Sequence, residues 1–275
     1  MKQNELIKNE VVLYPGLDKD LNLKAIPLAN TVITGATGAG KSILEMNIIK
    51  NLIEFYSHDS IEISIWDGKG VEYINWLPKK NGEVSTERWL PHIKHIAINS
   101  DWVSGEVNSV CDFMTREEFV RKISKEVEVK KECMKNMYNC ISYKQFTEKY
   151  PGRNLILPHI VILDEFEASK DSDDSLIELL KVCENAGVFL IIANQSFRES
   201  HCRLLEHCKN ILCLRCHKET SAYLLNSFIA AELPKNGYCY YLNKNTGDIA
   251  LLKVPFMPET FLRKFVGSYS VRRQR

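Results

Sequence analysis

The stretch that decides the fold reads Gly-Ala-Thr-Gly-Ala-Gly-Lys-Ser and comprises Gly35, Ala36, Thr37, Gly38, Ala39, Gly40, Lys41 and Ser42. It matches the pattern G-x-x-x-x-G-K-[ST] at every fixed position. A short β-branched run at residues 31–34 precedes it, and apolar residues with a helical period follow it. A glycine-rich turn between strand and helix points backbone amides and a helix dipole at an anion. The stretch therefore predicts a phosphate-binding loop.

The polar residues of this loop predict its cofactors. The Lys41 ammonium is expected to reach the β and γ phosphates of ATP. The Ser42 hydroxyl is expected to bind Mg²⁺, which the phosphates share. All eight residues of the loop, 35–42, are candidates for nucleotide binding, so ATP and Mg²⁺ are the predicted cofactors.

A second motif supplies two carboxylates. Residues 160–163 are Ile-Val-Ile-Leu, an apolar run typical of a buried strand, and Asp164 and Glu165 follow at its end. Asp164 is predicted to hold Mg²⁺ opposite Ser42, and Glu165 to orient the attacking water. In isolation, this Asp-Glu pair would be interpreted as a solvated strand end. Its combination with the phosphate loop favours a catalytic role.

Gln195 is a third candidate. It follows another apolar run, residues 188–193, and the carboxyl ends of parallel strands meet at one edge of a sheet. Gln195 is therefore predicted to respond to the γ phosphate. The alternative is that its amide only satisfies backbone groups in the loop that follows.

The alternation of apolar strands with helical segments predicts the fold class. We expect an α/β fold, a RecA-like P-loop NTPase core with a mostly parallel central sheet and helices on both faces. Residues 1–275 are interpreted as one domain. Within it we expect lead-in strands in residues 1–30, paired through a Pro15-Gly16 turn, an insertion with a long charged helix in 79–150, and a basic tail at 263–275. Residues 79–112 carry no motif that we can interpret.

Composition excludes several classes of protein. The chain has 275 residues, a net charge of +1, 45% hydrophobic and 26% charged residues, which is a globular balance rather than a disordered or polybasic one. No apolar run approaches the roughly 20 residues of a membrane span, and no signal peptide begins the sequence. Nine cysteines without an export signal predict free thiols and a cytoplasmic location, with recruitment to the inner membrane face through a partner left open.

Cysteine and histidine residues gather in residues 201–217, which include the string Cys-Leu-Arg-Cys-His at 213–217. This string matches a haem-attachment motif, but the missing export signal argues against haem. A zinc site is also disfavoured, because residues three apart on a strand point to opposite faces of a sheet. We therefore interpret Cys213 and Cys216 as buried thiols.

The combined motifs resemble the FtsK/SpoIIIE family of hexameric DNA-translocating ATPases over most of the chain. The matching segments are NTVITGATGAGKS at 30–42, IWDGKGVEY at 65–73, LPHIVILDEFEA at 157–168 and ENAGVFLIIANQS at 184–196. Three segments depart from the family pattern. Gly68 stands in place of a proline, Lys130 and Lys131 stand in place of Arg-Arg in the long helix, and residues 194–197, Asn-Gln-Ser-Phe, replace Thr-Gln-Arg-Pro.

The resemblance implies a homo-hexameric ATPase motor that moves double-stranded DNA in chromosome segregation or conjugative transfer. The first alternative is an ATPase domain of a type VII secretion machine with protein substrates and a membrane-anchored partner. The second is a nucleotide-binding docking module with little hydrolysis, against which the intact Lys41 and Glu165 weigh. The resemblance also implies an arginine supplied to a neighbouring subunit, for which Arg198, Arg203 and Arg215 remain candidates.

Overall fold

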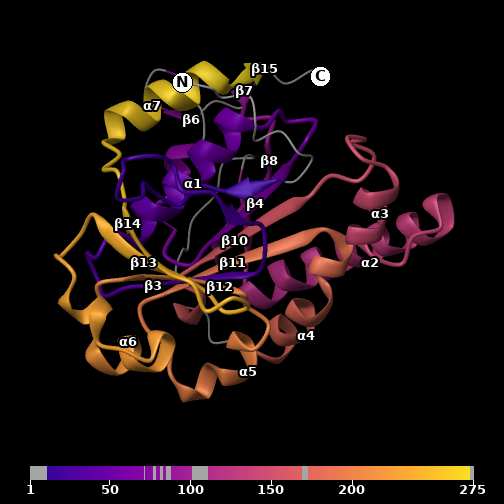
Figure 1. Cartoon of the computed structure of the whole chain (residues 1–275). Coiled ribbons are helices and arrows are strands. Elements are labelled where there is room, and N and C mark those ends of the chain that lie inside the picture. Colours follow the sequence, from indigo (N-terminus) through magenta and orange to yellow (C-terminus); the bar gives the residue numbers. More distant parts are fainter. Residues whose placement is uncertain are drawn as a thin grey trace.

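A nine-stranded sheet forms the centre of the chain (Figure 1). The computed structural model describes residues 11–70, 72–76, 79–80, 83–84, 88–100, 111–168 and 173–272. The sheet order is β14-β13-β12-β3-β11-β10-β4-β8-β9. The strands are β3 (Thr31–Thr34), β4 (Glu62–Asp67), β8 (Ile93–Asn99), β9 (Asp112–Met114), β10 (His159–Asp164), β11 (Val188–Asn194), β12 (Asn210–Leu214), β13 (Tyr238–Asn243) and β14 (Ile249–Lys253).

The strands from β12 to β9 pair in parallel, and only β13 and β14 pair antiparallel with their neighbours. The register places Asp164 of β10 beside Asp67 of β4, and Asn194 of β11 beside Thr34 of β3. The carboxyl ends of four strands therefore lie at one edge, with the loop after β3 among them. The predicted α/β fold with a mostly parallel sheet is confirmed.

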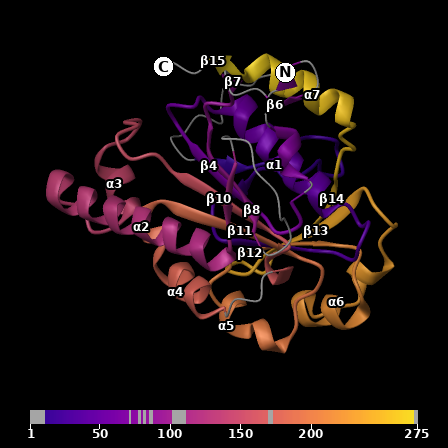
Figure 2. The same cartoon turned by 180° about the vertical axis from the view of Figure 1, so that it is seen from behind.

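Helices cover both faces of the sheet (Figures 1 and 2). The α-helices are α1 (Lys41–Phe55), α2 (Arg116–Tyr138), α3 (Tyr143–Lys149), α4 (Asp174–Val182), α5 (Cys202–Leu205), α6 (Lys218–Leu225) and α7 (Glu259–Tyr269). Alternate residues of β10 enter opposite cores, because strand side chains alternate between faces. Ile160 and Ile162 pack with the face of α1 and α7, whereas Val161 and Leu163 pack with α2 and α4.

The helix ends follow the expected local signals. Thr115 accepts a hydrogen bond from Glu118 N, and the Glu118 carboxylate accepts one from Thr115 N, so the predicted capping box starts α2. Gly187, with φ +73°, ends the 3₁₀ helix η3 (Glu184–Ala186) in the left-handed conformation that glycine favours. The part of 79–150 that the structure describes includes β8 and β9, which belong to the central sheet.

Shorter elements surround this core. They are β1 (Val12–Leu13) with β2 (Ile26–Pro27), β5 (Lys79–Lys80) with β6 (Glu83–Val84), β7 (Arg88–Trp89) with β15 (Val271–Arg272), and the 3₁₀ helices η1 (Tyr73–Trp76), η2 (Phe166–Ala168), η4 (Glu199–His201) and η5 (Ile229–Glu232). The lead-in pairing differs from the expected tight hairpin at Pro15-Gly16. Leu17, directly after Gly16, forms antiparallel bridges with both Leu23 and Lys253, and β1 pairs with β2 rather than with the residues that follow the turn. Residues 273–275 of the predicted basic tail lie outside the described residues.

Candidate active site

The phosphate loop connects β3 to α1, as its sequence predicts. A Cβ placed on Gly35 would lie 2.9 Å from Leu214 Cβ and 3.2 Å from Ala39 Cβ, so a side chain does not fit there. Gly40 has φ +101°, a conformation that L side chains rarely adopt. The glycines are therefore required by the path of the backbone. Ser42 follows Lys41 in the first turn of α1 and is half-buried.

Lys41 turns back over the loop. Its Nζ donates to the Gly35 carbonyl oxygen at 2.9 Å and lies 3.3 Å from Glu165 Oε1. The Lys41 side chain is only 7% exposed, so its charge is compensated inside the site rather than by solvent. The structure thus brings together the lysine and the glutamate that the two sequence motifs singled out separately.

Glu165 lies directly after β10 in a strained conformation. Its φ is +48°, which places a non-glycine residue in the left-handed region. Lys69 Nζ donates to Glu165 Oε1 at 2.7 Å. Burial would raise the pKa of Glu165, but the hydrogen bond from Lys69 and the charges of Lys41 and Lys69 hold it below its ordinary value. Glu165 is therefore an ionised carboxylate between two ammonium groups.

Asp164 carries an unsatisfied oxygen in the site. It is 1% exposed, and among the described residues its Oδ1 has no hydrogen-bond partner. Burial, together with the charges of Asp67 and Glu165, raises its pKa to about 7. A buried carboxylate oxygen without a protein donor fits a hard cation, for which carboxylate and hydroxyl oxygens are the usual ligands. The donor set of Asp164 and Ser42 therefore suits Mg²⁺.

The sequence motifs assigned no role to Lys69. A tight turn after β4 positions this residue at the site. The Asp67 carboxylate accepts hydrogen bonds from the backbone N–H groups of Lys69, Gly70, Glu72 and Tyr73. These bonds hold the turn against the site, although the Lys69 side chain itself is 45% exposed. The position of this turn could have pointed to Lys69 from the sequence, because the turn follows β4, the strand that pairs with β10.

Gly68 has a physical reason to replace the proline of the family pattern. Its N–H donates to the Asp164 carbonyl oxygen at 3.1 Å, a bond that proline cannot make. A Cβ at Gly68 would lie 2.7 Å from the carbonyl oxygens of both Asp164 and Glu165. The turn therefore packs directly on the backbone of the two acidic residues.

Glu45 is a second residue that sequence reasoning missed. It lies on α1, is fully buried, and accepts a hydrogen bond from the Tyr73 hydroxyl. Burial and the charge of Asp164 raise the pKa of Glu45 well above its ordinary value. A glutamate on an apolar helix face carries no sequence signal of this environment, which depends on segments that fold next to it.

Gln195 connects the end of β11 to the phosphate loop. Thr37 Oγ1 donates to Gln195 Oε1 at 3.1 Å, and Thr34 Oγ1 donates to the Gln195 carbonyl oxygen at 3.3 Å. The next carboxylate along from the acidic pair, Glu167, accepts from Asn194 Nδ2 and lies 2.7 Å from His201 Nε2. The loop after β11 is therefore tied both to the phosphate loop and to the segment after β10.

The arginine candidates occupy different places. Arg215 contacts the phosphate loop through its backbone, because its carbonyl oxygen accepts from Ala36 N at 2.8 Å, and its side chain is exposed. Arg203 is 3.3 Å from Asp174, on the α4 side, and Arg198 begins η4. Lys235 also approaches the loop, with its Cε 3.9 Å from where a Gly38 Cβ would stand.

One sequence argument about the cysteines is wrong. Cys213 and Cys216 were expected on opposite faces of a strand, but β12 ends at Leu214 and the chain bends at Arg215. Their sulfurs lie 3.6 Å apart. Within the described ranges, no group of three or more histidine, cysteine or acidic residues is arranged to hold a metal ion.

No helix of the described part of the chain has the length and apolarity that crossing a bilayer demands.

The chain is similar in structure to ATPase domains of secretion proteins. It superimposes on the cytoplasmic domain of the type VII secretion ATPase EccC of Thermomonospora curvata with a TM-score of 0.70 and 19% identity, over 97% of this chain and 32% of that one. It matches EssC (ATPases 2 and 3) of Geobacillus thermodenitrificans with a TM-score of 0.66 and 16% identity, over 98% and 51%. The chain thus spans about a third to a half of these proteins.

A smaller viral protein has a related fold. The genome packaging NTPase B204 of Sulfolobus turreted icosahedral virus 2 matches with a TM-score of 0.50 and 16% identity, over 84% of this chain and 98% of that one. No protein-family model matches the chain, and no curated protein matches it in sequence. The fold is therefore that of the ATPase domains of these proteins, which agrees with the P-loop ATPase fold that the resemblance predicts.

Proposed function

We propose that this chain is an ATP-hydrolysing domain whose conformational cycle drives a macromolecule. The observation that carries this proposal is the convergence of Lys41, Glu165 and the unpaired oxygen of Asp164 at the end of β10 and the start of α1. Bound ATP would supply the phosphoanhydride that is cleaved, and Mg²⁺ the neutralisation of phosphate charge. The residues that hold them would be the loop 35–42 with Lys41 for the nucleotide, and Ser42 with Asp164 for the metal.

The chain's own groups then have distinct tasks. Lys41 exchanges its contacts with the Gly35 carbonyl oxygen and Glu165 for the negative charge of a nucleotide, since all three compete for one ammonium group. Glu165 keeps its proton-accepting form through its pair with Lys69 and orients water. Gln195 accepts a hydrogen bond from Thr37 of the phosphate loop, so a change at the bound phosphates would also move the loop after β11.

Protein cargo is the better-supported substrate. The sequence resemblance placed double-stranded DNA first, but the secretion ATPases superimpose over nearly the whole chain and with higher TM-scores than the packaging NTPase. The net charge of +1 also offers little bulk attraction to a polyanion. We therefore place a type VII secretion-like role on the cytoplasmic face of a membrane ahead of DNA translocation. The homo-hexamer is kept as the proposed assembly.

Glu165→Gln tests hydrolysis. The variant should bind ATP as the unmodified protein does, because the amide is isosteric, and should lose turnover by at least about 100-fold, because an amide accepts protons poorly. Binding is read with a fluorescent ATP analogue and turnover by phosphate release. Normal turnover in Glu165→Gln would exclude the role of Glu165.

Duplex DNA separates the two cargo classes. The ATPase rate of the unmodified protein is measured with and without long linear duplex DNA, beside its mass by light scattering. We expect an unchanged rate. A several-fold DNA-dependent increase in a confirmed hexamer would restore the DNA-motor interpretation.

A further inference from the structure

The two thiols at the end of β12 form a close pair beside the phosphate loop. Cys213 is the penultimate residue of β12, and Cys216 follows the bend at Arg215. Both are buried, and their sulfurs are separated by 3.6 Å. A disulfide needs about 2.05 Å between sulfurs, so an approach of roughly 1.5 Å would join them. None of the roles proposed above uses either thiol.

The two thiols differ in reactivity. The hydrogen bond between the two sulfurs lowers the pKa of Cys216, and the same contact, with burial, raises the pKa of Cys213 well above its ordinary value. The thiolate is the nucleophilic form of cysteine. Cys216 is also the more accessible of the two, at 6% exposed against 0% for Cys213, so Cys216 is the attacking thiol and Cys213 the partner that completes the disulfide.

The residues between the two cysteines are the ones that touch the phosphate loop. Leu214 Cβ lies 2.9 Å from where a Cβ of Gly35 would stand, and the Arg215 carbonyl oxygen accepts from Ala36 N. Cys213 itself pairs in parallel register with Thr34, the last residue of β3. A displacement of residues 213–216 would therefore change the contacts that hold the phosphate loop.

We propose that Cys213 and Cys216 are a redox site, which a peroxide converts to a disulfide that withdraws Leu214 and Arg215 from the phosphate loop. The disulfide is independent of the ATPase activity proposed above, whereas its effect on nucleotide binding rests on it. Closing the pair tightens the chain between the two cysteines, which are three residues apart. Because Ala36 N of the loop donates to the Arg215 carbonyl oxygen at 2.8 Å, withdrawing Arg215 either breaks this bond or pulls the loop with it.

The chemistry balances with one peroxide molecule. The Cys216 thiolate attacks a peroxide oxygen, the O–O bond breaks, and Cys216 becomes a sulfenic acid while hydroxide leaves and takes up a proton as water. The Cys213 sulfur then attacks the Cys216 sulfur, its proton is lost, and the S–O bond breaks with release of a second water. Two thiols lose two electrons, which hydrogen peroxide gains.

Intact and peptide mass spectrometry test the site itself. The protein is treated with stoichiometric hydrogen peroxide, alkylated without reductant and digested. We expect a peptide linking Cys213 to Cys216, lighter by two hydrogens and removed by dithiothreitol. Cys202→Ser, which removes an exposed thiol, should leave this product unchanged, whereas Cys213→Ser and Cys216→Ser should abolish it. Absence of the linked peptide from folded, unmodified protein would overturn the proposal.

Binding of a fluorescent ATP analogue tests the coupling. Oxidised protein should bind the analogue about tenfold more weakly, the loss expected from one support of the loop, and dithiothreitol should restore binding. Cys213→Ala and Cys216→Ala each keep binding in the presence of peroxide; thermal unfolding verifies that each is folded. Equal affinity of oxidised and reduced protein would exclude the coupling. Failure of reduced protein to bind the analogue would count against the ATPase proposal alone, because the linked peptide is scored separately.

Discussion

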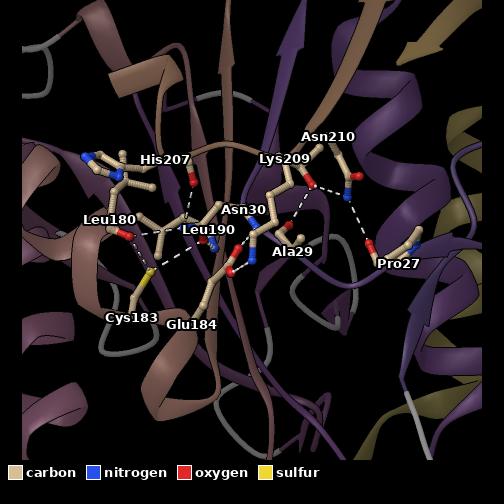
Figure 3. Close-up of polar contacts among 11 residues, drawn as sticks. Pro27, Ala29, Asn30, Leu180, Cys183, Glu184, Leu190, His207, Lys209 and Asn210 are labelled. Atoms are coloured by element: carbon tan, nitrogen blue, oxygen red, sulfur yellow. Dashed lines mark hydrogen bonds and ion pairs between the residues drawn. The ribbon is translucent and has the colours of Figure 1, made fainter. Parts of the chain in front are cut away.

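Two buried polar side chains at opposite ends of the central sheet, Asn30 and Asp164, differ in how fully the protein satisfies their hydrogen bonds. At the amino ends of β3, β11 and β12, Asn30 is fully used (Figure 3). Its side-chain amide donates to Leu180 O at 3.3 Å and His207 O at 3.2 Å, and its side-chain oxygen accepts from Leu190 N at 2.9 Å. Its backbone N–H donates to Glu184 Oε1 at 2.7 Å. This end joins strands and helices with every polar atom of one side chain.

A neighbouring amide extends the same arrangement. Asn210 Nδ2 donates to Pro27 O at 2.8 Å and to Thr31 Oγ1 at 3.2 Å, while its side-chain oxygen accepts from Tyr241 OH at 3.2 Å (Figure 3 shows the bond to Pro27). Buried polar groups satisfied in this way stabilise the fold and specify its register.

The carboxyl ends carry the opposite pattern. Among the described residues, Asp164 Oδ1 and Glu45 Oε1 are buried without hydrogen-bond partners, and Glu165 is strained. Unsatisfied buried groups cost free energy, and they persist at sites where a ligand completes them. The comparison indicates that Asn30 and Asn210 join strands and helices at one end of the sheet, whereas the other end carries unpaired groups that the proposed nucleotide and metal would complete. Four substitutions can break or sharpen it.

The largest effect is expected for Lys41→Met. The variant loses the ammonium group that compensates negative charge in the site, so ATP turnover should fall by at least about 10³-fold. Phosphate release measures turnover. Lys50→Met, on the same helix but paired with Glu54 on the surface, is the matched control and should retain activity. Comparable turnover in the two variants would show that the site lies elsewhere.

Asn30→Ala should damage the other end. It removes the hydrogen bonds that the Asn30 side chain makes to the Leu190 N–H and to two carbonyl oxygens, so the free energy of unfolding should fall by about 3 kcal/mol. Urea denaturation measures the loss, and Asn245→Ala at an exposed turn is the control. The folded fraction should still bind the ATP analogue. An unchanged unfolding midpoint would contradict the structural role of Asn30.

Asp164→Asn should lower turnover, though less than Lys41→Met, and yet stabilise the metal-free protein. Because the folded-state pKa of Asp164 is raised to about 7 from an ordinary 3.8, the folded state retains a proton that the unfolded state releases between these values. The contribution of Asp164 to stability therefore falls as pH rises from about 4 to 7. Above pH 7 the neutral amide should be more stable by roughly 2–4 kcal/mol.

Urea denaturation in EDTA at several pH values measures this gain for Asp164→Asn. The difference between the two proteins should vanish near pH 4, where both side chains are neutral. A constant difference at all pH values would instead assign the change to packing.

The smallest effect is expected for Lys69→Met. Its hydrogen bond helps to hold the pKa of Glu165 low, so removing it raises that pKa and moves the acid limb of the pH–rate profile to higher pH. At pH 8, where Glu165 stays ionised, turnover should change by less than about threefold. Lys94→Met, which removes a pair with Glu62 and Glu126, should leave the profile in place. An unmoved acid limb in Lys69→Met would show that Lys69 does not control the pKa of Glu165 during turnover.

Much of the fold and of the candidate site could be predicted from the sequence. The loop 35–42, the apolar strand before Asp164 and the capping box at Thr115 depend on residues that are adjacent in the chain, and the structure has each as a local unit. Their apolar periods are enough to predict a parallel sheet, because strands buried on both faces have few other solutions. The resemblance then predicted the fold that the comparisons show.

What the sequence alone determined is the set of local conformations and the chemical types at their ends: a glycine turn before a helix, and two carboxylates after a buried strand. Only the tertiary structure decided which groups meet. Lys69 reaches Glu165 across 96 residues, and a bend after β12 brings two thiols together that strand geometry would separate. The physical reason is that burial, pKa and unpaired atoms are properties of packing between distant segments, for which no residue type or spacing carries a signal.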